Sequence, residues 1–237
     1  MEAGHQKNEE EKEIRVTGQP KTLTMKQNVV ILDQQQKSLC QIKIGEKKAT
    51  GFLCKISDHP VLITNNHVIN ENLLEPGKEI KICFTDAKQN PHYKTIKIDT
   101  RRTTYTADEV EGINIDTTII ELYPNEDGLK DQKFMELDDQ LMTEDVYDIY
   151  APKDIYLIHY KDGEEVALSI GEINDDSKNE INSVTSYDLL HTCDTGKGSS
   201  GSPIILYNHK IIGVHRGRII NSKFNIATML QYPVKNL

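Results

Sequence analysis

Three polar residues, His67, Asp116 and Ser200, are of the types that together activate a hydroxyl group for attack on a carbonyl carbon. Ser200 lies in residues 194–203, a segment rich in glycine and serine that directly precedes an apolar run. In such a set, an imidazole takes the proton from the serine hydroxyl and a carboxylate orients the imidazole. The three residue types therefore indicate acyl transfer through a covalent serine intermediate.

The loop around Ser200 also offers a place for the negative charge that develops on the carbonyl oxygen. Glycine at position 198 lets the backbone bend, so that the N–H groups of Gly198 and Ser200 can point at one spot as oxyanion-hole donors. The loop alone is also compatible with a long flexible turn, and His67 or Asp116 alone with an ordinary turn residue. Their joint occurrence in the order histidine, aspartate, serine favours a catalytic site.

Rigid elements must hold these residues, and the chain from residue 28 onward predicts β-strands. Short runs of Val, Ile, Leu, Phe, Tyr and Thr are separated by turn residues, a pattern typical of a β-sandwich or β-barrel. Because helices do not alternate with these strands, a doubly wound α/β sheet is disfavoured. The expected strands are 28–32, 38–44, 49–56, 61–64, 79–84, 94–99 and 117–122 in the first half, and 155–160, 166–170, 203–207 and 210–214 in the second.

Changes in composition divide the chain into four parts, 1–24, 25–125, 126–144 and 145–237. The first part is charged and poor in apolar groups, so we expect a disordered tail. The second part carries strands together with the histidine and the aspartate, and the fourth carries strands together with the serine. The third part is polar and acidic and is expected to link two β-barrels.

Charge and hydropathy exclude several classes of partner. The formal net charge of the chain is -9 and its pI is about 5.4, which gives no electrostatic basis for nonspecific binding to nucleic acid or to an anionic membrane. No apolar stretch approaches the roughly 18 residues of a membrane helix. The first residues lack a basic region followed by an apolar one, so we expect no signal peptide. We predict a protein or peptide substrate, with no nucleic acid and no membrane as partner.

The cysteines indicate a reducing compartment. Cys40, Cys54, Cys83 and Cys193 are scattered, with neither the close pairs of a zinc site nor the density of a secreted disulfide framework. We predict four reduced, mostly buried thiols, no metal site and no cofactor. The expected location is the cytoplasm.

On the residues His67, Asp116 and Ser200 in this order, and on the glycine loop before the serine, the chain resembles the trypsin-like (chymotrypsin-fold) serine peptidases. The resemblance extends from about residue 28 to the C-terminus. It points to the branch without disulfides that includes the high-temperature-requirement proteases and the glutamyl endopeptidases. It implies an all-β fold of two six-stranded antiparallel β-barrels with the active site in the cleft between them. The implied activity is that of a serine endopeptidase, with an acyl-enzyme intermediate.

Two positions depart from the secreted members of the family. Val68 stands where they have a cysteine directly after the catalytic histidine, and Ser199 stands where they have an aspartate directly before the catalytic serine. That aspartate receives a new N-terminal ammonium group after zymogen cleavage. We therefore expect this chain to be competent as made, or to be regulated by a partner.

The resemblance implies a specificity pocket in the fourth part of the chain, 145–237. It leaves open which substrate side chain the pocket prefers. Asp194, six residues before Ser200, matches the position that selects Lys or Arg in trypsin. Thr195 and His215 match the positions that grip an acidic side chain in the glutamyl endopeptidases, and an acidic or polar preference is favoured. If Asp194 and His215 instead pair with each other, neither is free to recognise a charged substrate.

Two further hypotheses stay open besides a peptidase that uses a catalytic serine. One is a catalytically weak module of the same fold that binds peptides or acts as a scaffold. The other is a viral-type peptidase of this fold that acts on a polyprotein, which would more often use a cysteine nucleophile; Cys193 lies too early in the loop for that role.

Overall fold

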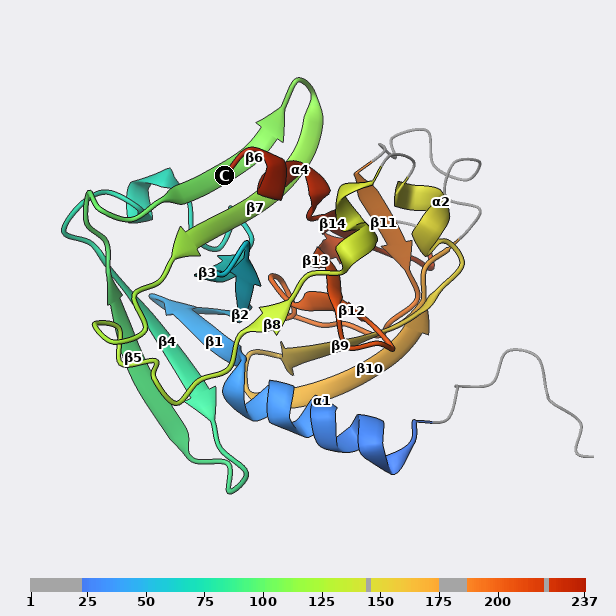
Figure 1. Ribbon diagram of the computed structural model, residues 1–237, viewed down its shortest axis with the longest axis horizontal. Helices are drawn as coiled ribbons and strands as arrows, with labels where there is room; N and C mark the ends of the chain where they lie inside the picture. Colours follow the sequence, from blue (N-terminus) through green and yellow to red (C-terminus); the bar gives the residue numbers. More distant parts are fainter. Residues whose placement is uncertain (1–22, 144–145, 175–186, 220–221) are drawn as a thin grey trace, which may run out of the picture.

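The structure is a computed structural model that describes residues 23–143, 146–174, 187–219 and 222–237. In this part of the chain two β-sheets, antiparallel apart from one short pairing, lie side by side with few helices (Figure 1). The prediction of an all-β fold in two halves is confirmed. The predicted tail falls outside the described residues, except for its last two positions.

The sheet of the N-terminal half has eight strands among the described residues, where the resemblance implied six and the sequence patterns indicated seven. Their order is β5-β4-β1-β2-β3-β7-β6, and β8 pairs with β2 in parallel. The strands that were not expected are β6, which is mostly polar, and β8, which has two residues. Neither has the apolar run by which a strand is recognised in a sequence. The bounds are β1 (Leu39–Ile44), β2 (Lys47–Ile56), β3 (His59–Thr64), β4 (Glu79–Thr85), β5 (Pro91–Lys97), β6 (Thr104–Val110), β7 (Ile113–Glu121) and β8 (Met135–Glu136).

Among the described residues, the sheet of the C-terminal half has six strands, in the order β10-β9-β12-β13-β14-β11, which is the number that the resemblance implied. The sequence patterns indicated four of them, all but β11 and β14. Antiparallel hairpins join β9 to β10 and β12 to β13, and these four strands lie at the expected ranges 155–160, 166–170, 203–207 and 210–214. The bounds are β9 (Asp154–Lys161), β10 (Glu165–Glu172), β11 (Asp188–His191), β12 (Pro203–Leu206), β13 (Ile211–Arg218) and β14 (Asn225–Met229).

The expected strand 28–32 is wrong, because these residues belong to helix α1 (Met25–Lys37). The hydroxyl of Thr24 accepts the N–H of Gln27 at 3.2 Å, and the side chain of Gln27 accepts the N–H of Thr24 at 2.9 Å. This capping box satisfies two backbone donors that a helix start otherwise leaves without partners. A run of four apolar residues is compatible with a strand or a helix, and the cap favours the helix.

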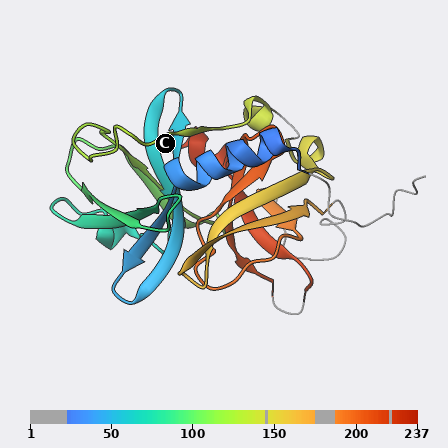
Figure 2. The same ribbon diagram turned by 90° about the horizontal axis from the view of Figure 1, so that it is seen from below.

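Helix α1 lies along both halves of the molecule (Figures 1 and 2). Its Ile31 is buried in the core of the C-terminal half. Gln34 donates to the carbonyl of His209 at 3.2 Å and accepts the hydroxyl of Tyr156 at 2.7 Å. The helix therefore joins the start of the described chain to the second sheet.

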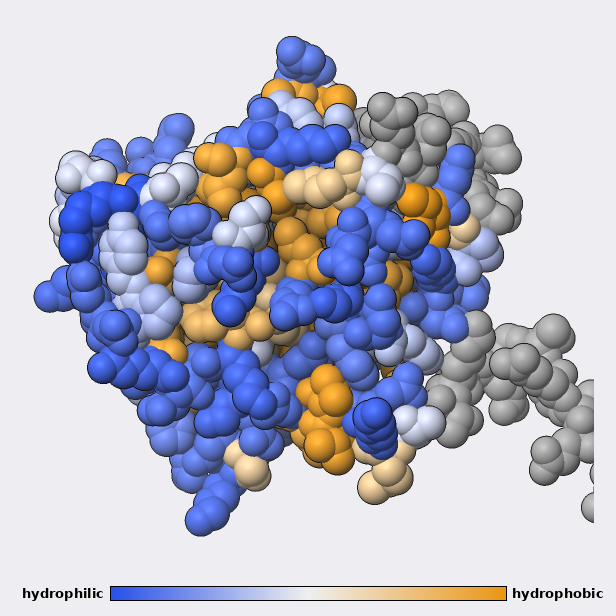
Figure 3. Space-filling view, viewed as in Figure 1, coloured by the Kyte–Doolittle hydropathy of each residue, from blue (hydrophilic) through white to orange (hydrophobic). Residues whose placement is uncertain are grey.

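Two hydrophobic cores meet at β2. Leu53 packs in the core of the N-terminal half, whereas its neighbours Phe52 and Cys54 pack in the core that fills the C-terminal half. Because successive side chains of a strand point to opposite faces, β2 is buried on both faces. Figure 3 shows hydrophilic residues over most of one face, with hydrophobic residues gathered between the two halves. The halves are thus joined by packing as well as by the chain.

The segment expected to be a linker, 126–144, packs on both halves where it is described. Leu129 is buried in the core of the N-terminal half, and Leu141, in the short helix η2 (Asp139–Met142), in that of the C-terminal half. In the described part of the chain, the remaining helices are η1 (Glu71–Leu73), α2 (Val146–Tyr150) and α4 (Gln231–Lys235). Among the described residues, no helix has the length and apolar character needed to cross a membrane.

Candidate active site

His67 lies in a turn just after β3, and hydrogen bonds of Asn65 stabilise this turn. The carbonyl of Asn65 accepts the N–H groups of Val68 and Ile69 at 3.2 and 3.1 Å, which closes the turn. The side chain of Asn65 donates to the carbonyl of Asp116 at 2.9 Å. One buried amide thus ties the histidine turn to the strand that carries the aspartate.

The carboxylate of Asp116 binds His67 twice. Its Oδ1 accepts the backbone N–H of His67 at 2.9 Å, and its Oδ2 lies 2.7 Å from the ring Nδ1. Asp116 is almost fully buried, whereas the His67 side chain is 48% exposed. Because the carboxylate can only accept, His67 Nδ1 carries the hydrogen and Nε2 has a free lone pair. His67 is therefore the tautomer that a general base requires.

Asp116 itself has a φ of +37°, in the left-handed region that is unfavourable for residues other than glycine. Its carbonyl and both carboxylate oxygens accept hydrogen bonds from the histidine turn, so the surrounding contacts fix the conformation. Strained backbone of this kind clusters at functional sites.

Ser200 faces the same cleft as His67. A cleft of about 740 Å³ is lined by both residues together with Val68 and Gly198. The Ser200 hydroxyl donates to the carbonyl of Arg216 at 3.4 Å, and no hydrogen bond joins it to His67 among the described residues. Rotation of one side-chain torsion would redirect the hydroxyl, and hydrogen bonds of this kind often tighten only when substrate is bound.

The loop before Ser200 presents two backbone donors without protein acceptors. Among the hydrogen bonds between described residues, none uses the N–H of Gly198 or of Ser200. Gly198 has a φ of +86°, and a Cβ there would lie 2.5 Å from the nitrogen of Gly163. Its carbonyl is held by the Thr50 hydroxyl at 2.7 Å, and the Ser200 carbonyl accepts the N–H of Thr50 at 2.9 Å. With the carbonyls fixed on β2, the two N–H groups are available to an oxyanion.

The residues predicted for the specificity pocket do not come together. Asp194 is exposed and forms an ion pair with Lys161 at 3.1 Å, and Thr195 is half-buried. His215 is buried and pairs with His191 instead, so Asp194 and His215 do not bind each other. None of the three predicted residues lines the cleft that contains His67 and Ser200.

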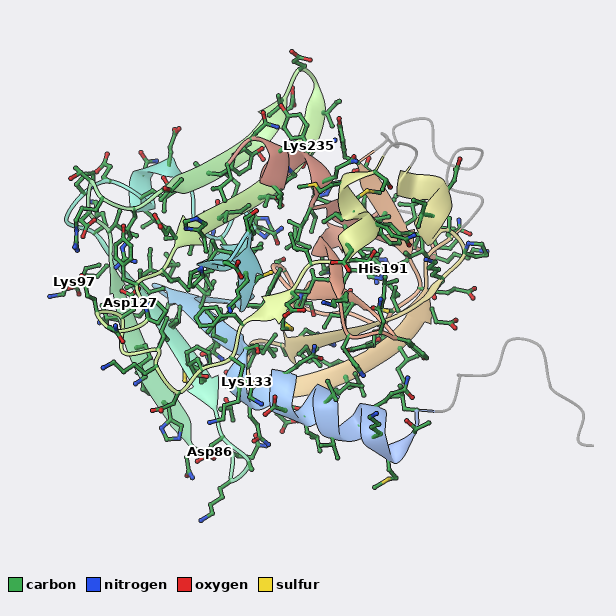
Figure 4. The ribbon with its side chains drawn as sticks, in the orientation of Figure 1. Asp86, Lys97, Asp127, Lys133, His191 and Lys235 are labelled. Atoms are coloured by element: carbon green, nitrogen blue, oxygen red, sulfur yellow. The ribbon has the colours of Figure 1, made fainter. Side chains whose placement is uncertain are left out.

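His191, which is labelled within the C-terminal half in Figure 4, forms a buried pair with His215. Nε2 of His191 lies 3.1 Å from Nδ1 of His215. Burial lowers the pKa of His191 to about 3 and the pKa of His215 well below its ordinary value. Nδ1 of His191 has no partner among the described residues, so the proton lies on Nε2, which donates to His215. His215 then carries its own hydrogen on Nε2.

Sequence reasoning missed Arg216, which joins the two halves beside the cleft. Its guanidinium group forms an ion pair with Asp188 at 2.6 Å and donates to the carbonyl of Asn114, two residues before Asp116. The strand register shifts between His215 and Gly217, so Arg216 lies in a bulge. The one signal in the sequence was an arginine close to a run of apolar residues. This signal does not reveal that the partners of Arg216 are Asp188 and Asn114, which are distant in the sequence.

The sequence model of a family described as a trypsin-like peptidase domain matches residues 49–214, a range that includes His67, Asp116 and Ser200. No curated protein sequence matches the chain significantly.

Several solved structures share the fold. Deg5 is 18% identical, with 89% of this chain and 91% of that chain covered and a TM-score of 0.57. The inactive form of the Rv3671c protease from M. tuberculosis is 17% identical, with 91% and 93% covered and a TM-score of 0.58. The serine protease domain of the Sesbania mosaic virus polyprotein is 18% identical, with 84% and 91% covered and a TM-score of 0.53. From the family match over more than half of its length, the chain belongs to the family of trypsin-like peptidase domains.

Proposed function

We propose that the protein is a serine endopeptidase in which Ser200 is the nucleophile, His67 the general base and Asp116 the residue that orients the base. The observation that carries this proposal is the pair of hydrogen bonds that His67 donates to Asp116, at 2.9 and 2.7 Å, at the edge of a cleft that Ser200 also lines. A serine without such a base nearby is a weak nucleophile.

In the proposed reaction, His67 first takes a proton from Ser200 and then gives this proton to the leaving group. Ser200 Oγ bonds to the carbonyl carbon of the substrate while its proton passes to Nε2 of His67. The imidazolium then gives this proton to the leaving amine as the C–N bond breaks, and Asp116 stabilises the imidazolium throughout. Water repeats the sequence on the acyl-enzyme and restores Ser200.

The N–H groups of Gly198 and Ser200 are proposed as the oxyanion hole. Both lack acceptors among the described residues, and the oxygen of the tetrahedral intermediate would supply one. In other serine peptidases, loss of one such donor costs about 2.7–4 kcal/mol of transition-state stabilisation.

A fluorophosphonate probe tests the nucleophile. We expect the probe to label the purified chain, Ser200→Ala to abolish labelling, and the control Ser222→Ala, in the same half of the molecule, to leave it unchanged. Labelling that survives Ser200→Ala would contradict the proposal. Absence of both labelling and peptide cleavage in the wild-type chain, with peptide affinity retained, would instead identify a binding module.

The substrate preference is proposed to be a polar side chain before the scissile bond. His215 adjoins the nucleophile loop, because its carbonyl accepts the N–H of Gly201 at 3.0 Å. Since burial lowers the pKa of His215, its ring is neutral at pH 7 and has no positive charge that would select an acidic side chain. A peptide library read for the residue before the cleaved bond tests this preference, and a strict preference for Lys or Arg would contradict it.

The cytoplasm is proposed as the location. All four cysteines are free and buried, which suits a reducing compartment. Cell fractionation in the source organism tests this, and recovery of the protein outside the cytoplasm would exclude it.

A further inference from the structure

Ser199, the residue between the two proposed oxyanion donors, is fixed at each of its polar atoms. It is fully buried. Its N–H donates to the carbonyl of Gly196 at 3.2 Å, and its carbonyl accepts both the N–H and the hydroxyl of Ser202. Its own hydroxyl accepts the N–H of Gly196 at 3.0 Å and lies 2.7 Å from Nδ1 of His159. The orientation of the peptide groups on either side of Ser199 therefore depends on these bonds.

His159 comes from the middle of a regular sheet and not from a loop. It lies on β9, which pairs with β10 on one side and β12 on the other, and its side chain is almost fully buried. Burial lowers the pKa of His159, so the ring is neutral. Among the described residues, Nδ1 of His159 is the one acceptor within hydrogen-bond distance of the Ser199 hydroxyl. The hydroxyl hydrogen therefore points to Nδ1, and the neutral ring carries its own hydrogen on Nε2.

Tyr160, the next residue of β9, stabilises the same loop at Gly198, one position before Ser199. The N–H of Tyr160 donates to the Thr50 hydroxyl at 3.0 Å, and this hydroxyl donates to the carbonyl of Gly198 at 2.7 Å. A Cβ at position 198 would lie 2.6 Å from the carbonyl oxygen of Tyr160. Two successive residues of one strand thus support the loop that carries both oxyanion donors, His159 through the Ser199 hydroxyl and Tyr160 through the Thr50 hydroxyl.

We propose that His159 is a positioning residue of the oxyanion hole, which holds Ser199 so that the N–H groups of Gly198 and Ser200 point into the cleft. This inference rests on the proposed peptidase function. It also explains Ser199 itself. In the secreted members that the chain resembles, an aspartate at this position needs an ammonium group released by cleavage. Here a neutral hydroxyl and a neutral imidazole, both built into the folded chain, hold the loop without any cleavage.

Three variants test the role of His159. His159→Phe keeps a planar ring but removes the acceptor, whereas His159→Asn keeps an acceptor oxygen near the place of Nδ1. His209→Phe is the matched control, because His209 also uses Nδ1 in one hydrogen bond, to the Tyr156 hydroxyl at 2.9 Å, in the same half but away from the loop.

The readouts are kcat, KM and the inhibition constant of a peptide boronate, whose tetrahedral adduct places an oxygen in the oxyanion hole. We expect His159→Phe to lower kcat about tenfold or more and to weaken the boronate by a similar factor, with KM changed less than about twofold, since the oxyanion donors act on the transition state. We expect His159→Asn to recover most of kcat and His209→Phe to keep it. Equal kcat values for His159→Phe and His209→Phe, or parallel changes in KM and boronate affinity, would overturn the proposal.

The amide 15N and 1H shifts of positions 198 and 200, measured in the Ser200→Ala chain, give a readout that needs no turnover. We expect His159→Phe to move both signals and His209→Phe to leave them in place; unmoved signals would contradict the role of His159. A wild-type chain that neither reacts with fluorophosphonate nor cleaves peptides would refute the peptidase function alone. If His159→Phe fails to fold, Ser199→Ala, which removes the other partner of the same bond, is expected to lower kcat in its place, and wild-type kcat would overturn the proposal.

Discussion

At the scale of the residue, the site depends on which atoms donate and which accept. The carboxylate of Asp116 accepts two hydrogen bonds from His67, and the backbone carbonyl of Asp116 accepts one from the side-chain amide of Asn65. Together these three contacts hold the His67 ring with its hydrogen on Nδ1. Ser199 and His159 fix each other in the same way. Exchange of an acceptor for a donor at these positions changes the chemistry while the shape stays nearly the same.

Asp116→Asn is the simplest test of that statement. The Asn oxygen can still accept the backbone N–H of His67, but its NH₂ group then faces Nδ1, which forces the ring hydrogen onto Nε2. We expect kcat to fall by a factor on the order of 10⁴ with little change in stability, as the same exchange does in trypsin. Steady-state kinetics and thermal unfolding measure the two effects. Asp131→Asn, an exposed exchange in the same half, serves as the control, and a Asp116→Asn chain with wild-type kcat would refute the assigned role.

Gly198→Ala tests the backbone of the nucleophile loop. Gly198 and Gly112 both have left-handed φ, +86° and +80°, but a Cβ would meet backbone atoms at 2.5–2.8 Å at Gly198 and nothing within 4 Å at Gly112. Gly112→Ala is expected to cost about 1–2 kcal/mol of unfolding free energy from φ alone. Gly198→Ala is expected to cost more and to lose peptidase activity. Urea unfolding compares the two variants, and equal losses would show that the loop is less closely packed than described.

At the scale of the element, a bulge in β13 connects the two halves of the molecule. Arg216 and Asp188 form an ion pair whose side chains are 8% and 3% exposed, and the same guanidinium group reaches the first residues of β7. Because the Arg216 carbonyl also accepts the Ser200 hydroxyl, this bulge contacts the serine and the strand of Asp116 together.

Arg216→Met is expected to destabilise the chain, because it removes the positive charge that pairs with the buried Asp188 carboxylate. Removing one member of a buried pair typically costs about 3–5 kcal/mol. Arg101→Met is the control, since Arg101 pairs with two carboxylates on the surface, and we expect a much smaller change. Denaturant unfolding measures both variants, and similar midpoints for the two would contradict the buried character of the pair.

At the scale of the whole molecule, stability depends on two buried histidines that are neutral in the folded chain. His191 and His215 are both buried, and burial lowers the pKa of each, to about 3 for His191. In the unfolded chain each imidazole binds a proton below a pH of about 6.5. The unfolded state therefore binds more protons than the folded one as the pH falls, and the folded state loses stability.

We expect the unfolding free energy to fall by up to about 1.4 kcal/mol per pH unit for each of the two histidines below pH ~6.5. Urea unfolding at pH 7.5 and pH 5 measures this loss. His191→Phe should reduce the dependence on pH, whereas a change of the exposed His59 should not affect it. An unfolding free energy that is the same at both pH values would show that the pair becomes charged in the folded chain.

The sequence by itself determined the types and order of the proposed catalytic residues, the glycine at position 198 and the division into two β-rich halves. These features are local: a strand is recognised by its apolar run, and a turn by glycine or asparagine. The sequence did not determine that residues 28–32 are helical, because a short apolar run fits either structure and the cap at Thr24 decides.

Only the tertiary structure decided which groups meet. His159 and Ser199 are 40 positions apart, and Arg216 and Asn114 are 102 positions apart. Asp194 is paired with Lys161 and not with His215. Partners of this kind are set by the register and packing of strands from both halves, which depend on all of the buried residues at once. A side chain's type therefore shows which bonds it can make, and the fold decides with which residue it makes them.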